Sequence, residues 1–161
     1  RDANAKHLYF QERDVLASIQ HPFIVSLHAV FVTREYWVFL LEYLQGGSLE
    51  DYVASHRGLV PLQEIRHRAA QILLALEHLH WRKVMYRDLK PTNVCLDAVG
   101  SCKLIDFGLA KLSETRASTY CGTQPYMAPE IISGVPYLHP VDVYAFGGVL
   151  YFLACKDHMP V

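Results

Sequence analysis

Two short stretches decide the fold of this chain: Tyr86-Arg87-Asp88-Leu89-Lys90-Pro91-Thr92-Asn93 and Ile105-Asp106-Phe107-Gly108. A short apolar hairpin separates them, so each stretch lies on a turn at the end of a strand. Charged and amide side chains gathered on such turns do not belong to a core. They indicate a binding site for a polyanion.

The spacing within these stretches fits the chemistry of phosphoryl transfer. Asp88 lies five residues before Asn93 with Lys90 between them, so one turn presents a proton acceptor, a cation and a metal ligand. A phosphoryl donor is highly charged and needs metal ions, and the oxygen ligands of Asn93 and Asp106 suit Mg²⁺. The stretches therefore predict a site where a phosphoryl group is positioned and its charge is stabilised.

The chain resembles the eukaryotic protein kinases, whose catalytic loop and magnesium motif match these two stretches. The resemblance continues through Gly122-Thr123, Tyr126-Met127-Ala128-Pro129-Glu130 and Asp142, in the order and at the separations of the family. Lysine at position 90 followed by proline is the pattern of serine/threonine kinases. Tyr86 stands where most of the family has histidine, and a tyrosine at this position resembles the AGC group.

This resemblance implies an α+β, two-lobed kinase fold of which the chain holds a part. Residues 1–42 would be a remnant of the small lobe with helix C and its fourth and fifth strands, and residues 43–47 would be the hinge. Residues 48–161 would be a mostly helical portion of the large lobe, ending at helix F. Because the chain starts without methionine and lacks a glycine-rich loop, we expect it to be a piece of a longer protein.

The resemblance also implies roles for the residues of the site. Asp88 would orient the substrate hydroxyl and accept its proton, and Lys90 would neutralise the transferring group. Thr123 would bond to both of them, while Asn93 and Asp106 would hold Mg²⁺. Asp142, in an apolar helix, needs internal donors, which the family supplies from the backbone of the catalytic loop.

Adenine of ATP would lie against the segment that follows a second apolar strand. The matching positions are the gatekeeper Leu41, then Glu42, Tyr43 and Leu44. Cys95 would lie under the adenine ring, and Glu12 would hold a lysine that this chain does not contain. The structural alternatives are a plain buried hairpin for the strands that lead into Leu41, and an acid at the edge of a helix for Glu12.

Regulation would act through the polar segment after Gly108. Thr119 is the expected activating phosphosite, a substrate for an upstream activating kinase, and Arg87 is placed to pair with the phosphate. Lys111 would add a second contact. The alternative is a flexible loop that merely contains hydroxyl groups.

Periodicity predicts the remaining elements. Helices are expected over residues 5–20, with Leu8 in the apolar stripe, from a cap at Ser48, and over residues 61–80. A last helix is expected from near Pro140; it is apolar almost all round, Val143 included, which indicates a buried helix. Strands are expected over residues 25–31, 37–41, 94–96 and 102–104. His78 and His80 are expected to be ordinary surface or packing residues.

Composition excludes several other classes of protein. A net charge of −1 over 161 residues gives no electrostatic case for binding nucleic acid or an anionic membrane. No apolar run is long enough to span a bilayer. The four cysteines form no metal or disulfide pattern, so we expect a reducing, cytoplasmic location.

Three hypotheses follow. The first is an ATP- and Mg²⁺-dependent serine/threonine protein kinase, active in the intact parent and acting on protein substrates. The second is a pseudokinase that serves as a binding or scaffold module. In the third, the polypeptide as given is an incomplete or truncated product that cannot phosphorylate anything. The glycine-rich loop and the lysine expected to meet Glu12 would discriminate between the first two.

Overall fold

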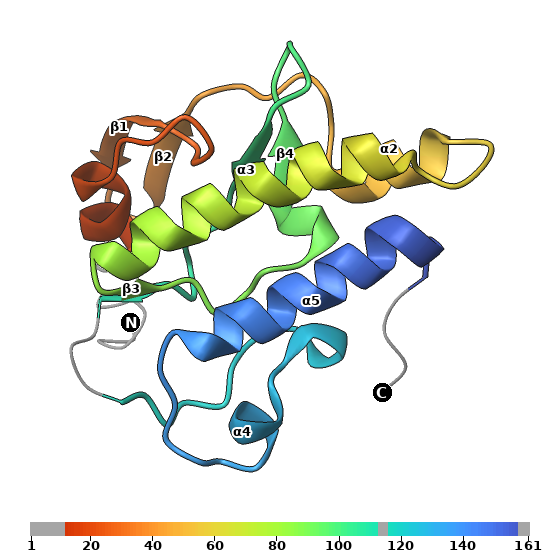
Figure 1. The fold of residues 1–161 in the computed structure, drawn as a ribbon. Coiled ribbons are helices and arrows are strands. Elements are labelled where there is room, and N and C mark those ends of the chain that lie inside the picture. The colour runs from red at the N-terminus through yellow and green to blue at the C-terminus, as the bar shows by residue number, and fades with distance from the viewer. Residues whose placement is uncertain (1–11, 113–115, 158–161) are drawn as a thin grey trace.

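The computed structural model describes residues 12–112 and 116–157, in which helices and strands mix as the predicted α+β fold requires (Figure 1). Residues 12–18 are helical. The other helices are α2 (Leu49–Ser55), α3 (Leu62–Trp81), α4 (Pro129–Ile132) and α5 (Pro140–Cys155), with 3-10 helices η1 (Pro91–Asn93) and η2 (Gln124–Tyr126). The strands are β1 (Leu27–Val32), β2 (Trp37–Leu41), β3 (Val84–Met85), β4 (Val94–Leu96), β5 (Cys102–Leu104) and β6 (Lys111–Leu112). The predicted start of the first helix, with Leu8, lies outside the described residues.

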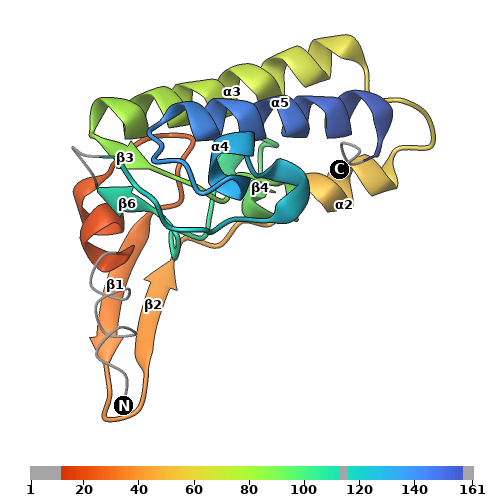
Figure 2. The ribbon, with the colours of Figure 1, turned by 90° about the horizontal axis from the view of Figure 1, so that it is seen from below.

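The long helices α3 and α5 run side by side and form the framework of the molecule (Figures 1 and 2). Helix α3 begins after Pro61, one residue later than predicted, because Pro61 has a non-helical ψ of 138° and is the N-cap residue of the helix. Its apolar stripe buries Ile72, Leu76 and Leu79 in the main core. Residues from the two ends of the chain, Val15 and Leu153 among them, join the same core.

Helix α5 is buried on one side only, so the prediction of a buried helix is confirmed for that side and was wrong for Val143. Val143 is 53% exposed, and Tyr144 and Tyr151 share that open side. Helix α3 and η2 cover the other side of α5, where Val149 and Leu153 are completely buried. An apolar sequence alone does not tell which face of a helix has a neighbour.

The short helix α2 begins at the predicted residue. The hydroxyl of Ser48 accepts a hydrogen bond from the Asp51 backbone N–H at 3.1 Å, and the Asp51 carboxylate accepts one from the Ser48 N–H at 2.9 Å. This reciprocal capping box satisfies two amides that the first turn of a helix leaves without partners. Just before it, Gly46 lies so close to β4 that a Cβ there would be 2.6 Å from the Leu96 Cβ.

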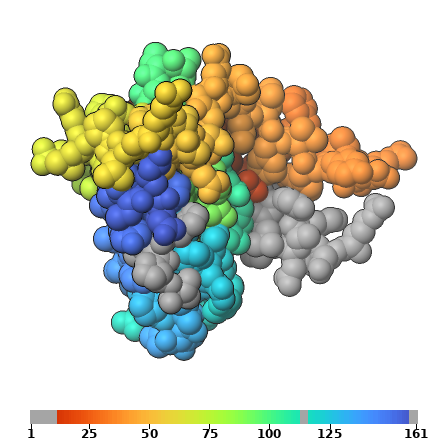
Figure 3. Space-filling model, turned by 90° about the vertical axis from the view of Figure 1, so that its right-hand side faces the viewer, coloured from red at the N-terminus to blue at the C-terminus, as the bar shows by residue number. Residues whose placement is uncertain are grey.

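Strands β1 and β2 form an antiparallel hairpin that projects from the helical body (Figures 2 and 3). β2 has the predicted bounds, whereas β1 begins at Leu27 because the Val25 N–H donates to the Leu104 carbonyl at 2.9 Å instead. Phe31 is 55% exposed, although the predicted alternation had placed it with the buried residues. A register shift between Leu27 and Ala29 interrupts that alternation, so one face of the hairpin is not consistently buried.

Two small sheets hold the loops that carry the predicted site. β4 and β5 have the predicted bounds, and they pair antiparallel with Val94 opposite Leu104. β3 pairs with β6, placing Met85 opposite Lys111. The first loop leaves β3 and the second loop reaches β6, so this pairing brings residues 86–93 close to residues 105–110. No described helix has the length and hydropathy of a membrane span.

Candidate active site

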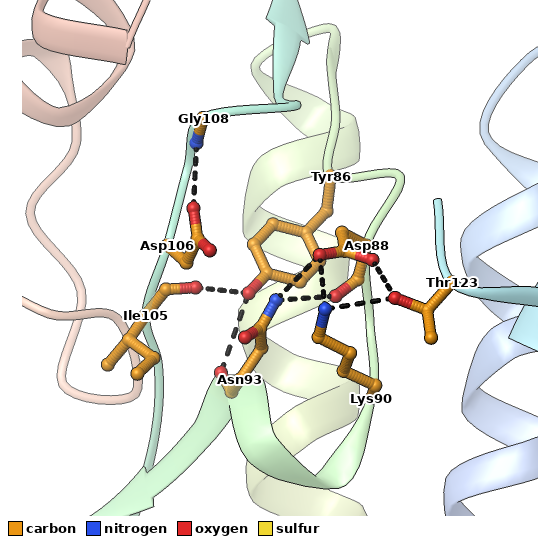
Figure 4. A network of polar contacts seen from close by, with 8 residues as sticks. All are labelled: Tyr86, Asp88, Lys90, Asn93, Ile105, Asp106, Gly108 and Thr123. Carbon is orange, nitrogen blue, oxygen red and sulfur yellow. Dashed lines mark hydrogen bonds and ion pairs between the residues drawn. The ribbon is translucent and has the colours of Figure 1, made fainter. Parts of the chain in front are cut away.

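Asp88 is the centre of a compact polar network (Figure 4). Its Oδ2 accepts a hydrogen bond from Lys90 Nζ at 2.9 Å, and its Oδ1 accepts one from the Thr123 hydroxyl at 2.8 Å. Lys90 Nζ also donates to the Thr123 hydroxyl at 2.9 Å, which closes a triangle of three groups. Asp88 is only 8% exposed. The network therefore fixes the orientation of this carboxylate from two directions.

Thr123 reaches the loop because Gly122 precedes it. Gly122 has a φ of +116°, a conformation that side chains other than glycine rarely adopt. A Cβ at this position would also lie 3.0 Å from the Arg87 carbonyl oxygen. Glycine thus lets the 116–123 segment approach the catalytic loop closely enough for Thr123 to touch Asp88.

Asn93 is buried beside Asp88, in the 3-10 helix η1. Its Nδ2 donates to the Asp88 backbone carbonyl at 3.0 Å and to the Asp88 Oδ2 at 2.9 Å. Because both of these bonds use the amide nitrogen, the amide oxygen stays available as an acceptor. An amide oxygen is a suitable ligand for a hard divalent cation.

Asp106 lies across the Tyr86 ring from Asp88 (Figure 4). Its backbone has a φ of 56°, and its Oδ1 accepts the Gly108 N–H at 3.1 Å. The Tyr86 hydroxyl donates to the Ile105 carbonyl, while its ring meets Phe107 edge-on at 5.2 Å between centroids. Burial, followed by the charges of Asp106 and Asp88, raises the pKa of Tyr86 well above its usual value, so the phenol stays protonated as a donor.

Asp142 of α5 ties the catalytic loop to the helical body, as predicted. Its carboxylate accepts hydrogen bonds from the backbone N–H groups of Tyr86 at 2.9 Å and Arg87 at 2.7 Å. His80 Nε2 donates to the same carboxylate at 2.8 Å. The prediction that His80 is an ordinary surface or packing residue was therefore wrong. The sequence signal, a histidine at the end of a long helix, gave no hint of a partner 62 residues away.

Arg87 and Thr119 are linked through Tyr137 rather than directly. The Arg87 Nε donates to the Leu109 carbonyl at 2.7 Å, and its Nη1 contacts the Tyr137 hydroxyl at 3.4 Å. That hydroxyl donates to the Thr119 carbonyl at 2.7 Å and lies 3.6 Å from Cys121 Sγ. The Tyr137 backbone pairs with Ala117 in both directions. Tyr137 was not predicted to belong to the site, because nothing in the neighbouring sequence marks this tyrosine as a link between Arg87 and Thr119.

Glu12 faces the turn that follows Asp106. A Cβ on Gly108 would lie 4.0 Å from Glu12 Oε2 and 3.2 Å from Asp106 Oδ1, so these two acids flank the same glycine. Burial, and then the Asp106 charge, raise the pKa of Glu12. A carboxylate in this position would be stabilised by a nearby cation.

The remaining predicted residues lie around this centre without joining its hydrogen-bond network. Leu41 and Leu44 are half-buried against the main core, on the segment that leads from β2 to α2. Cys95 is half-buried on β4, where it pairs with Lys103 on one side and bridges to Ser48 on the other. Lys111 is half-buried on β6.

A model of the protein kinase domain family matches residues 1–160. The chain therefore belongs to the protein kinase family, and its fold is part of the kinase fold, as predicted. Protein kinases use ATP with Mg²⁺ to phosphorylate proteins.

Among its relatives are AGC-group serine/threonine kinases. It is 45% identical over 144 residues to a cGMP-dependent protein kinase of Toxoplasma gondii, covering 89% of this chain and 14% of that protein. It is 42% identical over 150 residues to the serine/threonine-protein kinase Sgk3 of Mus musculus, covering 91% and 30%. It is 39% identical over 152 residues to the ribosomal protein S6 kinase alpha-1 of Homo sapiens, covering 92% and 20%. The chain thus spans less than a third of each of these relatives.

Proposed function

We propose that the full-length protein carrying this chain is a serine/threonine protein kinase that transfers the γ-phosphoryl group of ATP to hydroxyl groups of protein substrates. The observation that carries the proposal is the triangle of Asp88, Lys90 and Thr123, in which each group contacts the other two. A carboxylate held in this way beside an ammonium group suits the activation of an alcohol next to a transferring anion.

In this proposal Asp88 orients the substrate hydroxyl and accepts its proton. Lys90 neutralises negative charge on the transferring group, and Thr123 keeps both side chains aligned. The Thr123 hydroxyl donates its one hydrogen to Asp88 and accepts a hydrogen bond from Lys90. Thr123 therefore holds the acid and the cation at a fixed separation. Preorganisation of this kind lowers the barrier because the groups need not rearrange during the reaction.

Asn93 and Asp106 fit a magnesium site. The donors available are one amide oxygen and one carboxylate, both hard oxygen ligands. Within residues 12–112 and 116–157 no three His, Cys, Asp or Glu side chains form a metal cage. Such a sparse donor set fits Mg²⁺, which usually takes its other ligands from phosphate and water. The ion, when bound, would neutralise phosphate charge during transfer.

We propose that the base of ATP lies against Leu41, Glu42, Tyr43 and Leu44, over Cys95. Glu12 would pair with a lysine from a part of the protein outside this chain. Its raised pKa supports this role, because a nearby cation would stabilise the ionised carboxylate. Residues 1–42 then belong to the small lobe, residues 43–47 to the hinge, and residues 48–161 to the large lobe.

Phosphorylation of Thr119 by an upstream kinase would regulate the site. Thr119 is exposed, and its backbone is already tied to Arg87 through Tyr137. A phosphate there would add a strong acceptor within reach of that arrangement, with Lys111 as a second cation. The four cysteines are free, which supports the proposed cytoplasmic location.

The test uses the full-length protein and three versions of it: wild type, Asp88→Asn and Asp106→Asn. We expect wild type to phosphorylate protein hydroxyls, Asp88→Asn to bind ATP normally but lose nearly all transfer, and Asp106→Asn to lose the magnesium dependence of ATP binding. Wild type that binds ATP but transfers nothing would favour the pseudokinase alternative. Wild type that binds no ATP in the presence of Mg²⁺ would refute the proposed nucleotide site.

A further inference from the structure

The carboxylate of Glu42 makes two contacts that its expected backbone role in binding adenine does not require. Its Oε1 accepts the Ser26 backbone N–H at 2.7 Å and a hydrogen bond from Lys103 Nζ at 2.8 Å. The Glu42 N–H donates in turn to the Ser26 carbonyl at 3.0 Å. The side chain of Glu42 is 22% exposed and that of Lys103 is 13% exposed, so the ion pair is largely shielded from water.

These contacts join three segments that are far apart in the sequence. Ser26 follows residues that pair with β5, since Leu104 donates to the Phe23 carbonyl at 3.0 Å. Lys103 lies on β5, three residues before Asp106. Glu42 directly follows β2, at the start of the segment proposed to hold adenine. The Glu42 carboxylate therefore connects the proposed adenine side of the site to β5, the strand that leads to Asp106.

The electrostatics favour a fixed arrangement. Burial opposes the charge of Glu42, but its hydrogen bonds with Lys103 and with the Ser26 backbone outweigh burial and lower the pKa of this carboxyl group. A shielded charge that loses its partner is costly, whereas an exposed pair is worth little. Lys103 and Glu42 therefore hold each other in one geometry at neutral pH.

We infer that Glu42 and Lys103 form a positioning pair that holds the adenine-side segment in register with Asp106, so that the base and the phosphates of one nucleotide meet their sites together. The inference rests on the proposed function. Neither charged group is assigned to touch the reacting atoms, so the pair acts on nucleotide binding and not on the transfer step.

The experiment measures KM for ATP and kcat of the full-length protein in the variants Lys103→Met, Glu42→Gln and the double variant. Loss of a hydrogen bond between charged groups predicts a rise in KM of about tenfold with kcat nearly unchanged. Because the two residues act as one unit, the double variant should raise KM no more than either single variant. Lys103→Arg, which keeps the charge, should restore KM toward the wild-type value.

Exposed residues elsewhere provide the matched controls, Lys83→Met and Glu35→Gln, which should leave KM and kcat unchanged. A melting curve without nucleotide checks that each variant is folded. Unchanged KM in active, folded variants would overturn the positioning pair but leave the proposed function intact. A fall in kcat with unchanged KM, or additive effects of the two changes, would also overturn it. A wild-type protein without ATP-dependent transfer would refute both proposals.

Discussion

Asp142 and Arg87 are joined by a 2.7 Å hydrogen bond between a side-chain carboxylate and a backbone amide that are 55 residues apart in sequence. The same carboxylate, 1% exposed, accepts the Tyr86 amide. Two adjacent peptide groups of the catalytic loop thus depend on one buried acid. An acid can accept both bonds with its two oxygens, whereas an amide has only one oxygen to offer.

Asp142→Asn should therefore leave one buried loop N–H group without a partner. An unsatisfied buried group costs about 1–3 kcal/mol, so we expect a lower free energy of unfolding by that amount. Urea denaturation of the full-length protein measures it, and kcat should fall as the loop loosens. Asp14→Asn, at an exposed acid paired with Arg13, is the control and should change little. Equal midpoints for Asp142→Asn and wild type would contradict this prediction.

Thr123 gives a second prediction, because its hydroxyl contacts both Asp88 and Lys90. Thr123→Val keeps the shape but removes both bonds, whereas Thr123→Ser keeps the hydroxyl. Hydrogen bonds to charged groups are worth about 1.5–3 kcal/mol, which corresponds to a fall in kcat of roughly 10- to 100-fold for valine. Serine should retain most activity. Steady-state kinetics decide, and similar kcat values for valine and serine would count against the alignment role.

Tyr137 should stabilise the segment that holds Thr119. Tyr137→Phe removes the hydroxyl that donates to the Thr119 carbonyl and contacts Arg87. Each lost hydrogen bond is worth about 1 kcal/mol, so amide exchange at residues 117–121 should accelerate several-fold. Hydrogen exchange with mass spectrometry measures this change. Tyr151→Phe, on the exposed side of α5, is the control. Unaltered exchange in Tyr137→Phe would mean that the bridge is dispensable.

Cys95 places a small side chain at the proposed adenine floor. Cys95→Leu adds apolar surface worth about 0.8 kcal/mol per buried methylene group. We expect ATP to bind the full-length variant at least as tightly as wild type, measured by isothermal titration. Cys155→Ser, at an exposed cysteine, should show no change. Clearly weaker binding by Cys95→Leu would rule out this floor.

Acid should destabilise the protein through His139. Burial first, and then His80 and Lys83, lower its pKa, while Asp142 acts in the opposite direction. A histidine with a lowered pKa in the folded state binds its proton less readily than in the unfolded state. The contribution of His139 to the free energy of unfolding is therefore complete above pH 6.5, the pKa of histidine in the unfolded state. This contribution is lost as the pH falls through the lower pKa of the folded state.

The measurement compares urea midpoints at pH 7.5 and pH 5.5 for wild type, His139→Asn and the control His28→Asn, where His28 is exposed. We expect His139→Asn to lose less stability on acidification than wild type. The pKa of His21 is also lowered, first by burial and then by the charges of His78 and Lys103. Part of the pH dependence of stability therefore remains in every variant. An identical loss of stability in His139→Asn and wild type would refute the role of His139.

Sequence alone predicted the features that depend on neighbours in the chain. The cap at Ser48 and the turn between β4 and β5 follow from local hydrogen bonding and turn-forming residues. The membership of Asp88 and Asn93 in one site followed from their spacing on a single loop. These short-range signals fixed most of the elements and the centre of the site.

Contacts between distant parts of the chain could not be read from the sequence. His80 meets Asp142 across 62 residues, and Tyr137 meets Arg87 across 50. The exposure of Val143 depends on which face of α5 lies against other elements, a property that apolar composition does not encode. The ion pair of Glu42 likewise depends on β5, which places Lys103 beside it, and the sequence did not predict this contact.

Arg87 and Asp106 share a backbone conformation, with φ values of 68° and 56°, that glycine or asparagine would adopt with less strain. Selection for heat resistance alone would therefore favour glycine or asparagine at these two positions, as it would at Lys83 and Lys156, which have φ values of 61° and 59°. Under the proposed function, such variants would survive heating better but would lack the proposed Mg²⁺ ligand Asp106 or the proposed phosphate partner Arg87. Durability and activity thus make opposite demands on the same two peptide units.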